Sequence, residues 1–315
     1  MSKKIAFIFP GQGAQAVGMG KDLYDNFASA KSVYNTADSV LGKSVSSLCF
    51  EGPEDALKQT VNTQPCIVTT SIAALEALKS KLDIEPDYVA GHSLGEYCAM
   101  YTAGVMSLET TLKAIQKRAD LMGQTKGGAM AAVLNSTEDV LKAGLVEGSK
   151  VGYVDVANYN SPAQVVITGD ENAVKAAGDY ILANGARRVV PLAVSGAFHS
   201  KFMENAGKEF ESFVSSLDLR EASIPVITNV DAAATTASAD FRVKMPRQIY
   251  SSVHWTQTIQ KMVSDGVEIF VEIGPGKVLA VLNKKIAPEA SVFNVLDKES
   301  LENTISSLKE ELALV

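Results

Sequence analysis

A serine at the centre of a Gly-x-Ser-x-Gly motif is the feature that most constrains the fold of this chain. The motif runs from Gly91 to Gly95, with Ser93 in the middle. Residues 87–90 before it end in an apolar run that is typical of a short buried strand, and the small and apolar side chains within residues 96–103 suit a tightly packed helix. A serine on such a turn has a strained backbone and an exposed hydroxyl, and the flanking glycines let strand and helix approach closely. The motif therefore predicts an α/β sheet with a nucleophilic serine at the end of a strand.

Strand-like and helical segments alternate along the chain, which is typical of an α/β sheet. Residues 127–194 instead follow the order β-α-β-β-α-β, which predicts a ferredoxin-like unit. We therefore predict a large α/β-hydrolase-like domain with a parallel-sheet core, made of residues 1–126 and 195–315. The ferredoxin-like small domain, residues 127–194, would be inserted into it. Expected helices of the large domain include residues 21–41, 54–60, 64–81, 107–124 and 243–249, and the last expected elements are a strand at 268–272 and a helix at 278–285.

Composition and charge exclude several classes of function. The 315 residues carry a formal net charge of −7 without a basic stripe, which argues against nucleic-acid binding. The apolar run at residues 5–9 is stopped by Pro10-Gly11 and is too short for a signal peptide or a membrane span. The three cysteines, Cys49, Cys66 and Cys98, lack zinc-site spacing. We therefore expect a cytoplasmic protein with no metal site and no contact with a membrane.

Histidine is scarce, so the search for a base that could activate Ser93 is short. The chain has three histidines, His92, His199 and His254. His92 precedes Ser93 on the turn, so its side chain should point away from the serine hydroxyl. His254 lies next to Trp255, which favours packing or a surface position. His199 lies in the loop after the predicted small domain, between the two domains, and is the better candidate base.

Five short segments carry a resemblance to a known family. They are residues 9–15 (FPGQGAQ), 91–97 (GHSLGEY), 158–162 (NYNSP), 198–200 (FHS) and 272–277 (EIGPGK). In this order they resemble the malonyl-CoA:acyl-carrier-protein transacylases of bacterial fatty-acid synthesis, and the resemblance extends to about residue 295. It implies transfer of a malonyl group through a malonyl-serine intermediate.

The resemblance implies a catalytic role for five residues. Ser93 would attack the thioester carbonyl, and His199 would take its proton as general base. In the family a backbone carbonyl orients the imidazole, and the matching position is Gln248. The backbone amides of Gln12 and Leu94 would form the oxyanion hole.

The resemblance also implies residues that select the acyl group. Taken alone, Arg118 is a helix arginine of the kind that usually lies at the surface or in an ion pair. By resemblance its guanidinium binds the malonyl carboxylate through a bidentate pair. Phe198 resembles the phenylalanine of malonyl-selective relatives, and its bulk would disfavour an extra methyl group on the α-carbon. Gln64, Met122 and Asn160 match further pocket positions, although Met122 is also compatible with plain core packing.

The implied partners are malonyl-CoA and holo-acyl carrier protein. Coenzyme A and phosphopantetheine would be parts of the substrates, so no metal and no redox cofactor is expected. Carrier proteins are acidic, and docking would need a local basic patch. The candidates are Lys277, Lys284 and Lys285, which are equally compatible with a solvated helix end.

Alternative functions stay open at this point. A polyketide-pathway acyltransferase would use the same chemistry. A serine thioesterase or hydrolase would use the same turn and would need an acid, for which Asp155, Asp170 and Asp179 are candidates. Residues 11–16 match the G-x-G-x-x-A pattern of dinucleotide-binding proteins, but the stretch at 29–41, where that fold needs a strand, is expected to be helical. A catalytically idle scaffold is disfavoured because Ser93 and the other implied site residues are present.

Overall fold

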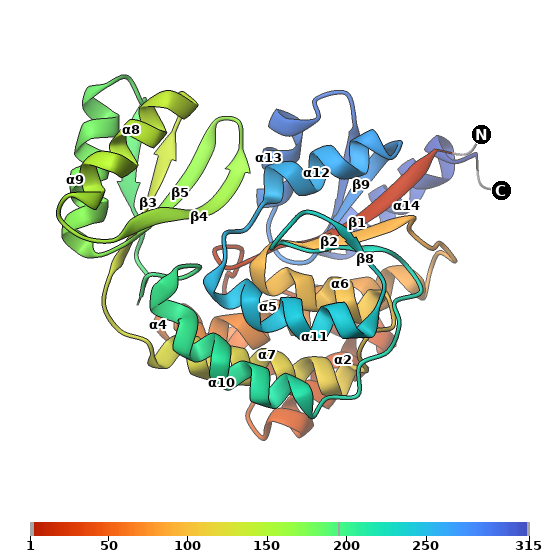
Figure 1. The fold of residues 1–315 in the computed structure, drawn as a ribbon. Helices are drawn as coiled ribbons and strands as arrows, with labels where there is room; N and C mark the ends of the chain where they lie inside the picture. The colour runs from red at the N-terminus through yellow and green to blue at the C-terminus, as the bar shows by residue number, and fades with distance from the viewer. Residues whose placement is uncertain (1–2, 195, 314–315) are drawn as a thin grey trace.

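Two β-sheets of different kinds form the framework of the molecule (Figure 1). The structure is a computed structural model that describes residues 3–194 and 196–313. The larger sheet has six strands, which are β1 (Lys4–Phe9), β2 (Tyr88–Gly91), β7 (Val226–Ile227), β8 (Ala234–Thr235), β9 (Val267–Ile273) and β10 (Ser291–Val295). The smaller sheet has four, which are β3 (Ala129–Leu134), β4 (Val154–Ser161), β5 (Gln164–Gly169) and β6 (Arg188–Pro191).

The larger sheet has the order β10-β9-β1-β2-β7-β8 and is parallel except at one edge. All neighbours from β10 to β7 pair in parallel, and β8 pairs antiparallel with β7. Parallel strands need long crossover connections, and helices on both faces of the sheet supply them (Figure 1). The predicted parallel-sheet core is confirmed. The helices outside the small sheet are α1 (Lys21–Asn26), α2 (Ala28–Leu41), α3 (Val45–Glu51), α4 (Glu54–Leu57), α5 (Thr60–Lys79), α6 (Glu96–Thr102), α7 (Leu108–Gln124), α10 (Glu204–Ser215), α11 (Ser238–Tyr250), α12 (Trp255–Ser264), α13 (Val278–Ile286) and α14 (Lys298–Glu311).

The smaller sheet has the predicted ferredoxin-like arrangement. Its chain order is β3, α8 (Glu138–Ser149), β4, β5, α9 (Glu171–Ala183) and β6, and its strand order is β4-β5-β3-β6 with every pair antiparallel. Helices α8 and α9 pack together on the face that points away from the larger sheet (Figure 1). Gly127 and Gly196, on the two chain crossings, form an isolated bridge with each other. The domain boundaries themselves stay a prediction, and residue 195, where the large domain was predicted to resume, lies outside the described residues.

Several of the predicted helices have different bounds in the structure, among them the helix expected over 54–60, which ends at Leu57. The helix expected over 21–41 is interrupted at Phe27, whose backbone is extended (φ −129°). The helix expected to begin near Gln64 begins at Thr60, and Pro65 lies inside it. Proline has no N–H for the carbonyl four residues before it. That carbonyl, Val61 O, instead accepts hydrogen bonds from Lys43 Nζ (3.4 Å) and Gln116 Nε2 (3.3 Å), which is why the helix continues through the proline. The helix expected over 243–249 begins earlier, at the start of α11.

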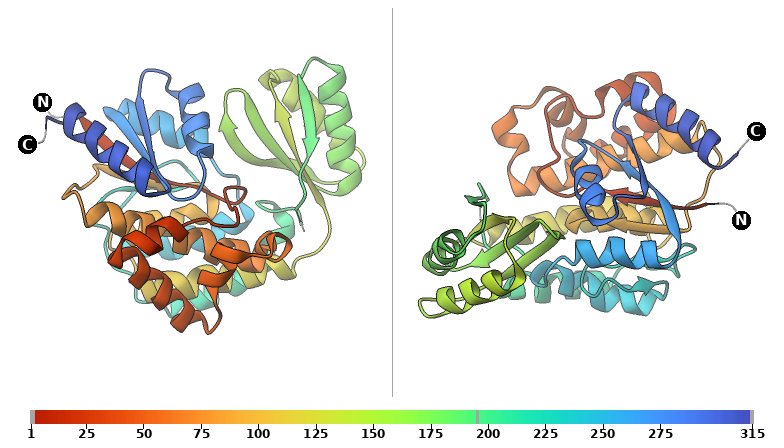
Figure 2. Two further views of the ribbon diagram at one scale, coloured as in Figure 1. Left: turned by 180° about the vertical axis from the view of Figure 1, so that it is seen from behind. Right: turned by 90° about the horizontal axis from the view of Figure 1, so that it is seen from above.

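The last two elements of the fold were not expected from the sequence. Strand β10 extends the larger sheet beside β9, and α14 packs against β10. Helix α14 begins at a capping box, in which Asp297 accepts from Ser300 N (2.8 Å) and Ser300 Oγ accepts from Asp297 N (3.0 Å). The two ends of the described chain lie side by side, where Lys3 forms an ion pair with Glu311 (Figure 2).

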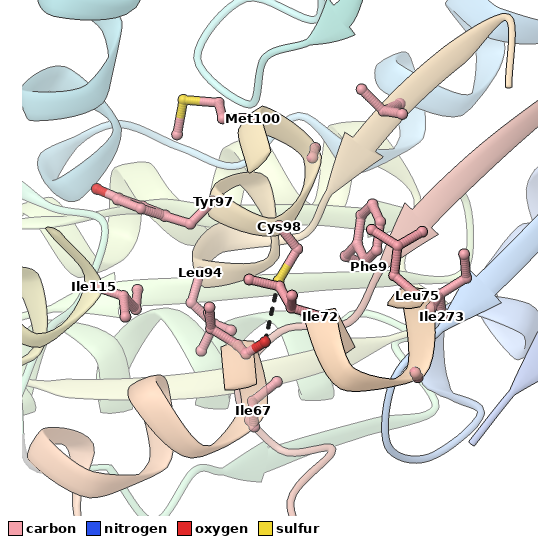
Figure 3. Packing of buried hydrophobic residues seen from close by; sticks show 14 of the residues in the cluster. Phe9, Ile67, Ile72, Leu75, Leu94, Tyr97, Cys98, Met100, Ile115 and Ile273 are labelled. Atoms are coloured by element: carbon pink, nitrogen blue, oxygen red, sulfur yellow. Dashed lines mark hydrogen bonds between the residues drawn. The ribbon is translucent and has the colours of Figure 1, made fainter. Parts of the chain in front are cut away.

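A dense apolar core lies directly beneath the Gly-x-Ser-x-Gly turn (Figure 3). Leu94, Tyr97 and Cys98 follow the serine, are almost fully buried, and pack among side chains of α5, α7 and the larger sheet. Cys98 Sγ also donates to Val68 O of α5 (3.8 Å). Because an interior of this density resists displacement, it fixes the position of the turn.

Among residues 3–194 and 196–313, no helix has the length and apolar character needed to cross a membrane. Within those ranges, no group of three or more His, Cys, Asp or Glu side chains is arranged to hold a metal ion.

Candidate active site

Ser93 lies on a strained turn between β2 and α6. Its φ is +51°, a left-handed conformation that is costly for a residue with a side chain. The flanking glycines are required by close approach, because a Cβ on Gly91 would lie 1.9 Å from the carbonyl carbon of Gly95 and a Cβ on Gly95 would lie 2.3 Å from Phe9 O. The turn therefore has the strained geometry that the motif predicts.

His199 is hydrogen-bonded to Ser93. The distance between Ser93 Oγ and His199 Nε2 is 2.8 Å, and His199 Nδ1 lies 2.9 Å from Gln248 O and 3.1 Å from Ser251 O. Since backbone carbonyls only accept, Nδ1 carries the proton and Nε2 is free to accept the serine proton. Burial, and secondarily the positive charge of Arg118, lower the pKa of His199 to about 3. The imidazole is therefore neutral at physiological pH, as a general base must be.

Arg118 extends from α7 to the same serine. Its side chain is only 1% exposed, Nη2 donates to Ser93 Oγ (3.0 Å) and to Gln248 Oε1 (3.0 Å), and Nη1 donates to Gln64 Oε1 (2.6 Å). Its Nε is buried without a partner, and the guanidinium lies 5.8 Å from the centre of the Tyr97 ring. Burial lowers the pKa of this arginine. Every acceptor bonded to the guanidinium is neutral, and Glu96 acts on it only through space, so an anionic group placed beside Ser93 would find a cation without a hydrogen-bonded counter-charge.

The two amides predicted to form an oxyanion hole belong to two segments that meet at the Ser93 turn. Leu94 is the second residue of the short helical segment Ser93–Gly95, at whose start backbone N–H groups have no partner within the helix. Gln12 is exposed in the loop after β1, and that loop runs over the turn, because a Cβ on Gly11 would lie 2.7 Å from His92 O. The loop that carries Gln12 thus lies against the turn that carries Leu94, and their role as an oxyanion hole stays a prediction.

The remaining predicted pocket residues fall into two groups. Met122 belongs to the arginine network, because its Sδ accepts from Gln64 Nε2 (3.5 Å). Asn160 lies on β4 of the smaller sheet and Phe198 on the loop before the base. Asn160 Oδ1 is 2.8 Å from His92 Nε2, and Phe198 O accepts from Thr168 Oγ1 (3.0 Å). These contacts connect the smaller sheet to the residues that directly precede the nucleophile and the base.

The three aspartates that a hydrolase could use as its acid are bonded to groups other than His199. Asp155 accepts from Val156 N, Asp170 accepts from Tyr153 N, and Asp179 pairs with Lys175. None of the three accepts from His199, whose Nδ1 is occupied by two backbone carbonyls. The dinucleotide alternative also lacks support, since the stretch at 29–41 is helical and lies within α2.

The other two histidines lie away from the serine hydroxyl. His92 faces Asn160 and the ring of Trp255, with 5.7 Å between ring centres. His254 stacks on Tyr159, with 5.2 Å between ring centres and 12° between ring planes.

Sequence reasoning missed three residues of the site, one of which is Ser251, the source of the second carbonyl on His199. Asn229 follows β7, is fully buried, and bonds to the backbone of the turn on both sides of His92. Glu96, the first residue of α6, is 1% exposed and accepts from Asn229 N (2.6 Å). Burial raises the pKa of this carboxyl to about 7. Glu96 directly follows the motif and could have been noticed, whereas no local pattern marks Asn229.

Comparison with known proteins agrees with this geometry. The family model for the acyl transferase domain matches residues 6–300. The malonyl CoA-acyl carrier protein transacylase of Bacillus subtilis (strain 168) is 43% identical over 312 residues, covering 98% of this chain and 98% of that protein. The chain belongs to the malonyl CoA-acyl carrier protein transacylase family.

Solved structures of this transacylase family superpose on nearly the whole chain. The malonyl CoA-acyl carrier protein transacylase of Clostridium perfringens is 37% identical, with a TM-score of 0.94 and coverage of 99% of both chains. A malonyl-transacylase in complex with its type II PKS acyl-carrier protein is 34% identical, with a TM-score of 0.94 and coverage of 96% of this chain and 99% of that one. The family's fold therefore accounts for both sheets of this molecule.

Proposed function

We propose that this protein transfers a malonyl group from malonyl-CoA to the phosphopantetheine thiol of acyl carrier protein. The observation that carries the proposal is the convergence of a nucleophile, a neutral base and a buried cation on one atom, Ser93 Oγ. His199 Nε2 lies 2.8 Å from it and Arg118 Nη2 lies 3.0 Å from it. A serine–histidine pair is suited to acyl transfer, and the cation suits an acyl group that ends in a carboxylate.

In the first half-reaction the malonyl group moves to the enzyme. Ser93 Oγ attacks the thioester carbonyl carbon while its proton passes to His199 Nε2. The amides of Gln12 and Leu94 stabilise the oxyanion of the tetrahedral intermediate. The carbon–sulfur bond then breaks, and the departing thiolate of coenzyme A takes the proton from His199. The product is malonyl-Ser93 with a neutral histidine.

In the second half-reaction the same residues act in reverse. The phosphopantetheine thiol gives its proton to His199, and its sulfur attacks the ester carbonyl of malonyl-Ser93. The carbon–oxygen bond to Ser93 breaks, and the serine oxygen recovers a proton from the imidazolium. The carbonyls of Gln248 and Ser251 keep the imidazole in one tautomer through both halves.

Intact mass spectrometry tests the proposal directly. Brief incubation with malonyl-CoA should add one malonyl group to the wild-type protein and none to Ser93→Ala. Addition of holo-acyl carrier protein should remove the adduct and form the malonyl-carrier. Release of free coenzyme A and malonate without carrier-dependent transfer would instead establish a hydrolase.

We further propose that the carrier protein docks on one exposed face of α13. Lys277, Lys284 and Lys285 are exposed there, and Val278 and Val281, on the same helix, are also exposed. Positive charge around apolar side chains suits an acidic partner. The double variant Lys284→Glu/Lys285→Glu is expected to raise KM for the carrier about tenfold or more and to leave acylation by malonyl-CoA unchanged. Equal KM values in variant and wild type would place the docking surface elsewhere.

The remaining features of the proposal concern pathway, location and cofactors. Fatty-acid synthesis in the cytoplasm is the context that we infer, and a polyketide pathway would use the same chemistry. No metal or redox cofactor has a role in the steps above. Acylation of Ser93 is therefore expected to proceed at the same rate in the presence of EDTA.

A further inference from the structure

Asn229 occupies the centre of the backbone beneath the catalytic serine. It is fully buried, and all four of its polar groups are hydrogen-bonded. The side-chain Oδ1 accepts from Ser93 N (2.7 Å), and Nδ2 donates to Gly91 O (2.7 Å). The backbone N donates to Glu96 Oε2 (2.6 Å), and the backbone O accepts from His254 N (3.0 Å).

The side chain of Asn229 joins the two ends of the strained turn. Gly91 is the last residue of β2, and Ser93 has the left-handed backbone (φ +51°). Such a conformation persists only where the surroundings over-determine it. One amide group that bonds both to Gly91 O and to Ser93 N fixes the positions of these residues relative to each other.

The same contact determines which amides can serve the oxyanion. Ser93 N is engaged by Asn229 Oδ1 and cannot also donate to a substrate oxygen. The amide of Leu94 is left at the start of the helix for that purpose. Loss of Asn229 would free a competing donor at Ser93 as well as loosening the turn.

Glu96 in turn holds Asn229. Its carboxylate accepts from the backbone amide of Asn229, and it lies on the helix that follows the serine. The turn is therefore tied to the 228–230 segment at three points, which are Gly91, Ser93 and Glu96. The first two ties run through the side chain of Asn229 and the third through its backbone.

We propose that Asn229 is a positioning residue for acyl transfer, which holds the Ser93 turn in its attacking geometry and is itself fixed by Glu96. This inference rests on the proposed malonyl transfer. Because Asn229 touches neither Arg118 nor the acyl group, its loss acts on the rate of the chemical step and spares binding of the malonyl carboxylate. A displacement of about 1 Å at a reacting group can cost about 100-fold in rate.

The test compares single-turnover acylation of Ser93 by malonyl-CoA in wild type, Asn229→Ala and a matched control. Thr228→Val is the control, because Thr228 is the adjacent, fully buried residue and its side-chain hydrogen bonds go to the 231–244 segment and not to the turn. Asn229→Ala is expected to slow acylation about 100-fold with an unchanged KM for malonyl-CoA. Thr228→Val is expected to acylate within threefold of wild type, even where its melting temperature is lower.

A second variant keeps the test decisive where Asn229→Ala does not fold. Asn229→Asp retains the size and the acceptor for Ser93 N, but its ionised form cannot donate to Gly91 O. Protonation restores that donor, so the rate of this variant relative to wild type is expected to rise as pH falls from about 8 to about 5.5. Position 229 has Glu96 and His199 as its ionisable neighbours, and Arg118 and Lys244 are charged groups nearby. All four are present in both proteins, so any change in their charge affects both rates.

The outcomes separate this inference from the function on which it rests. If wild type forms no malonyl-Ser93, the proposed function fails. If wild type is acylated, and if Asn229→Ala folds and is acylated at a rate within threefold of wild type, the positioning role is wrong. A relative rate of Asn229→Asp that does not change with pH would also overturn it.

Discussion

Arg118 carries a buried positive charge that is bonded only to neutral acceptors. A malonyl carboxylate supplies the missing counter-charge, and a charge-assisted hydrogen bond contributes about 1.5–3 kcal/mol. Arg118→Ala is therefore expected to lower kcat/KM for malonyl-CoA about 10- to 150-fold. Acetyl-CoA has no carboxylate for the guanidinium to bind, so its kcat/KM should fall less, through loss of the contact between Arg118 and Ser93 Oγ alone.

The comparison needs both thioesters and a second variant. Arg118→Lys keeps the charge but loses the planar fork, so it should recover part of the malonyl activity. Steady-state kinetics with malonyl-CoA and acetyl-CoA give the ratio directly. An unchanged preference for malonyl in Arg118→Ala would assign selectivity to other residues.

The same arginine also acts on the base. After burial, its charge is the largest cause of the low pKa of His199, which lies near 3. Replacement by the neutral Arg118→Gln removes that cause and should raise the pKa of His199 by a measurable amount while burial keeps it below the ordinary 6.5. NMR titration of the imidazole resonances checks this. Wild type should stay neutral down to about pH 4, and a wild-type midpoint near 6.5 would contradict the burial argument.

At the scale of elements, the end of β9 is joined to the start of α13 by a buried carboxylate. Glu272 accepts from Leu279 N (3.0 Å) and Ala280 N (2.8 Å), two N-terminal amides of that helix. Burial raises the pKa of Glu272 from 4.5 to about 7. The folded protein therefore binds this proton more tightly than the unfolded chain, and the free energy of unfolding falls as pH rises through that window.

Because of this linkage, the free energy of unfolding should depend on pH, and Glu272→Gln should weaken that dependence. A shift of this size corresponds to about 3 kcal/mol between pH 4.5 and pH 7, and Glu96 contributes in the same direction. Glu272→Gln cannot ionise but loses one acceptor for the helix. This variant should have a lower free energy of unfolding than wild type at low pH. That free energy should fall less than in wild type as the pH rises to about 8. Urea unfolding at the two pH values measures this, and parallel curves for both proteins would refute it.

Elements marked by local patterns were predictable, and those set by distant partners were not. The turn at Ser93 and the β-α-β-β-α-β order follow from glycine spacing and apolar runs. The start of α5 did not follow, because the carbonyl released by Pro65 is satisfied by side chains of Lys43 and Gln116, far away in the sequence. Asn229 was missed for the same reason, since its partners lie about 130 residues earlier.

At the scale of the whole molecule, one segment joins the smaller sheet to the base. Gln248 O and Ser251 O orient His199. Two residues further on, Val253 N donates to Ala157 O (2.8 Å) and Val253 O accepts from Tyr159 N (2.9 Å), which attaches β4. The smaller sheet is thus bonded to the same stretch of backbone that fixes the imidazole. Its position relative to the larger sheet therefore bears on catalysis.

The hydroxyl of Thr168 allows a test of whether catalysis depends on the position of the smaller sheet. Thr168, on β5 of the smaller sheet, is fully buried and donates to Phe198 O (3.0 Å), the residue before His199. Thr168→Val keeps the shape but leaves a buried carbonyl unpaired, which costs about 1–3 kcal/mol. We expect the loop to shift and acylation of Ser93 to slow about tenfold, with KM for malonyl-CoA unchanged. Thr168→Ser retains the hydroxyl and should match wild type. Equal acylation rates for the valine and serine variants would mean that the smaller sheet does not position the base.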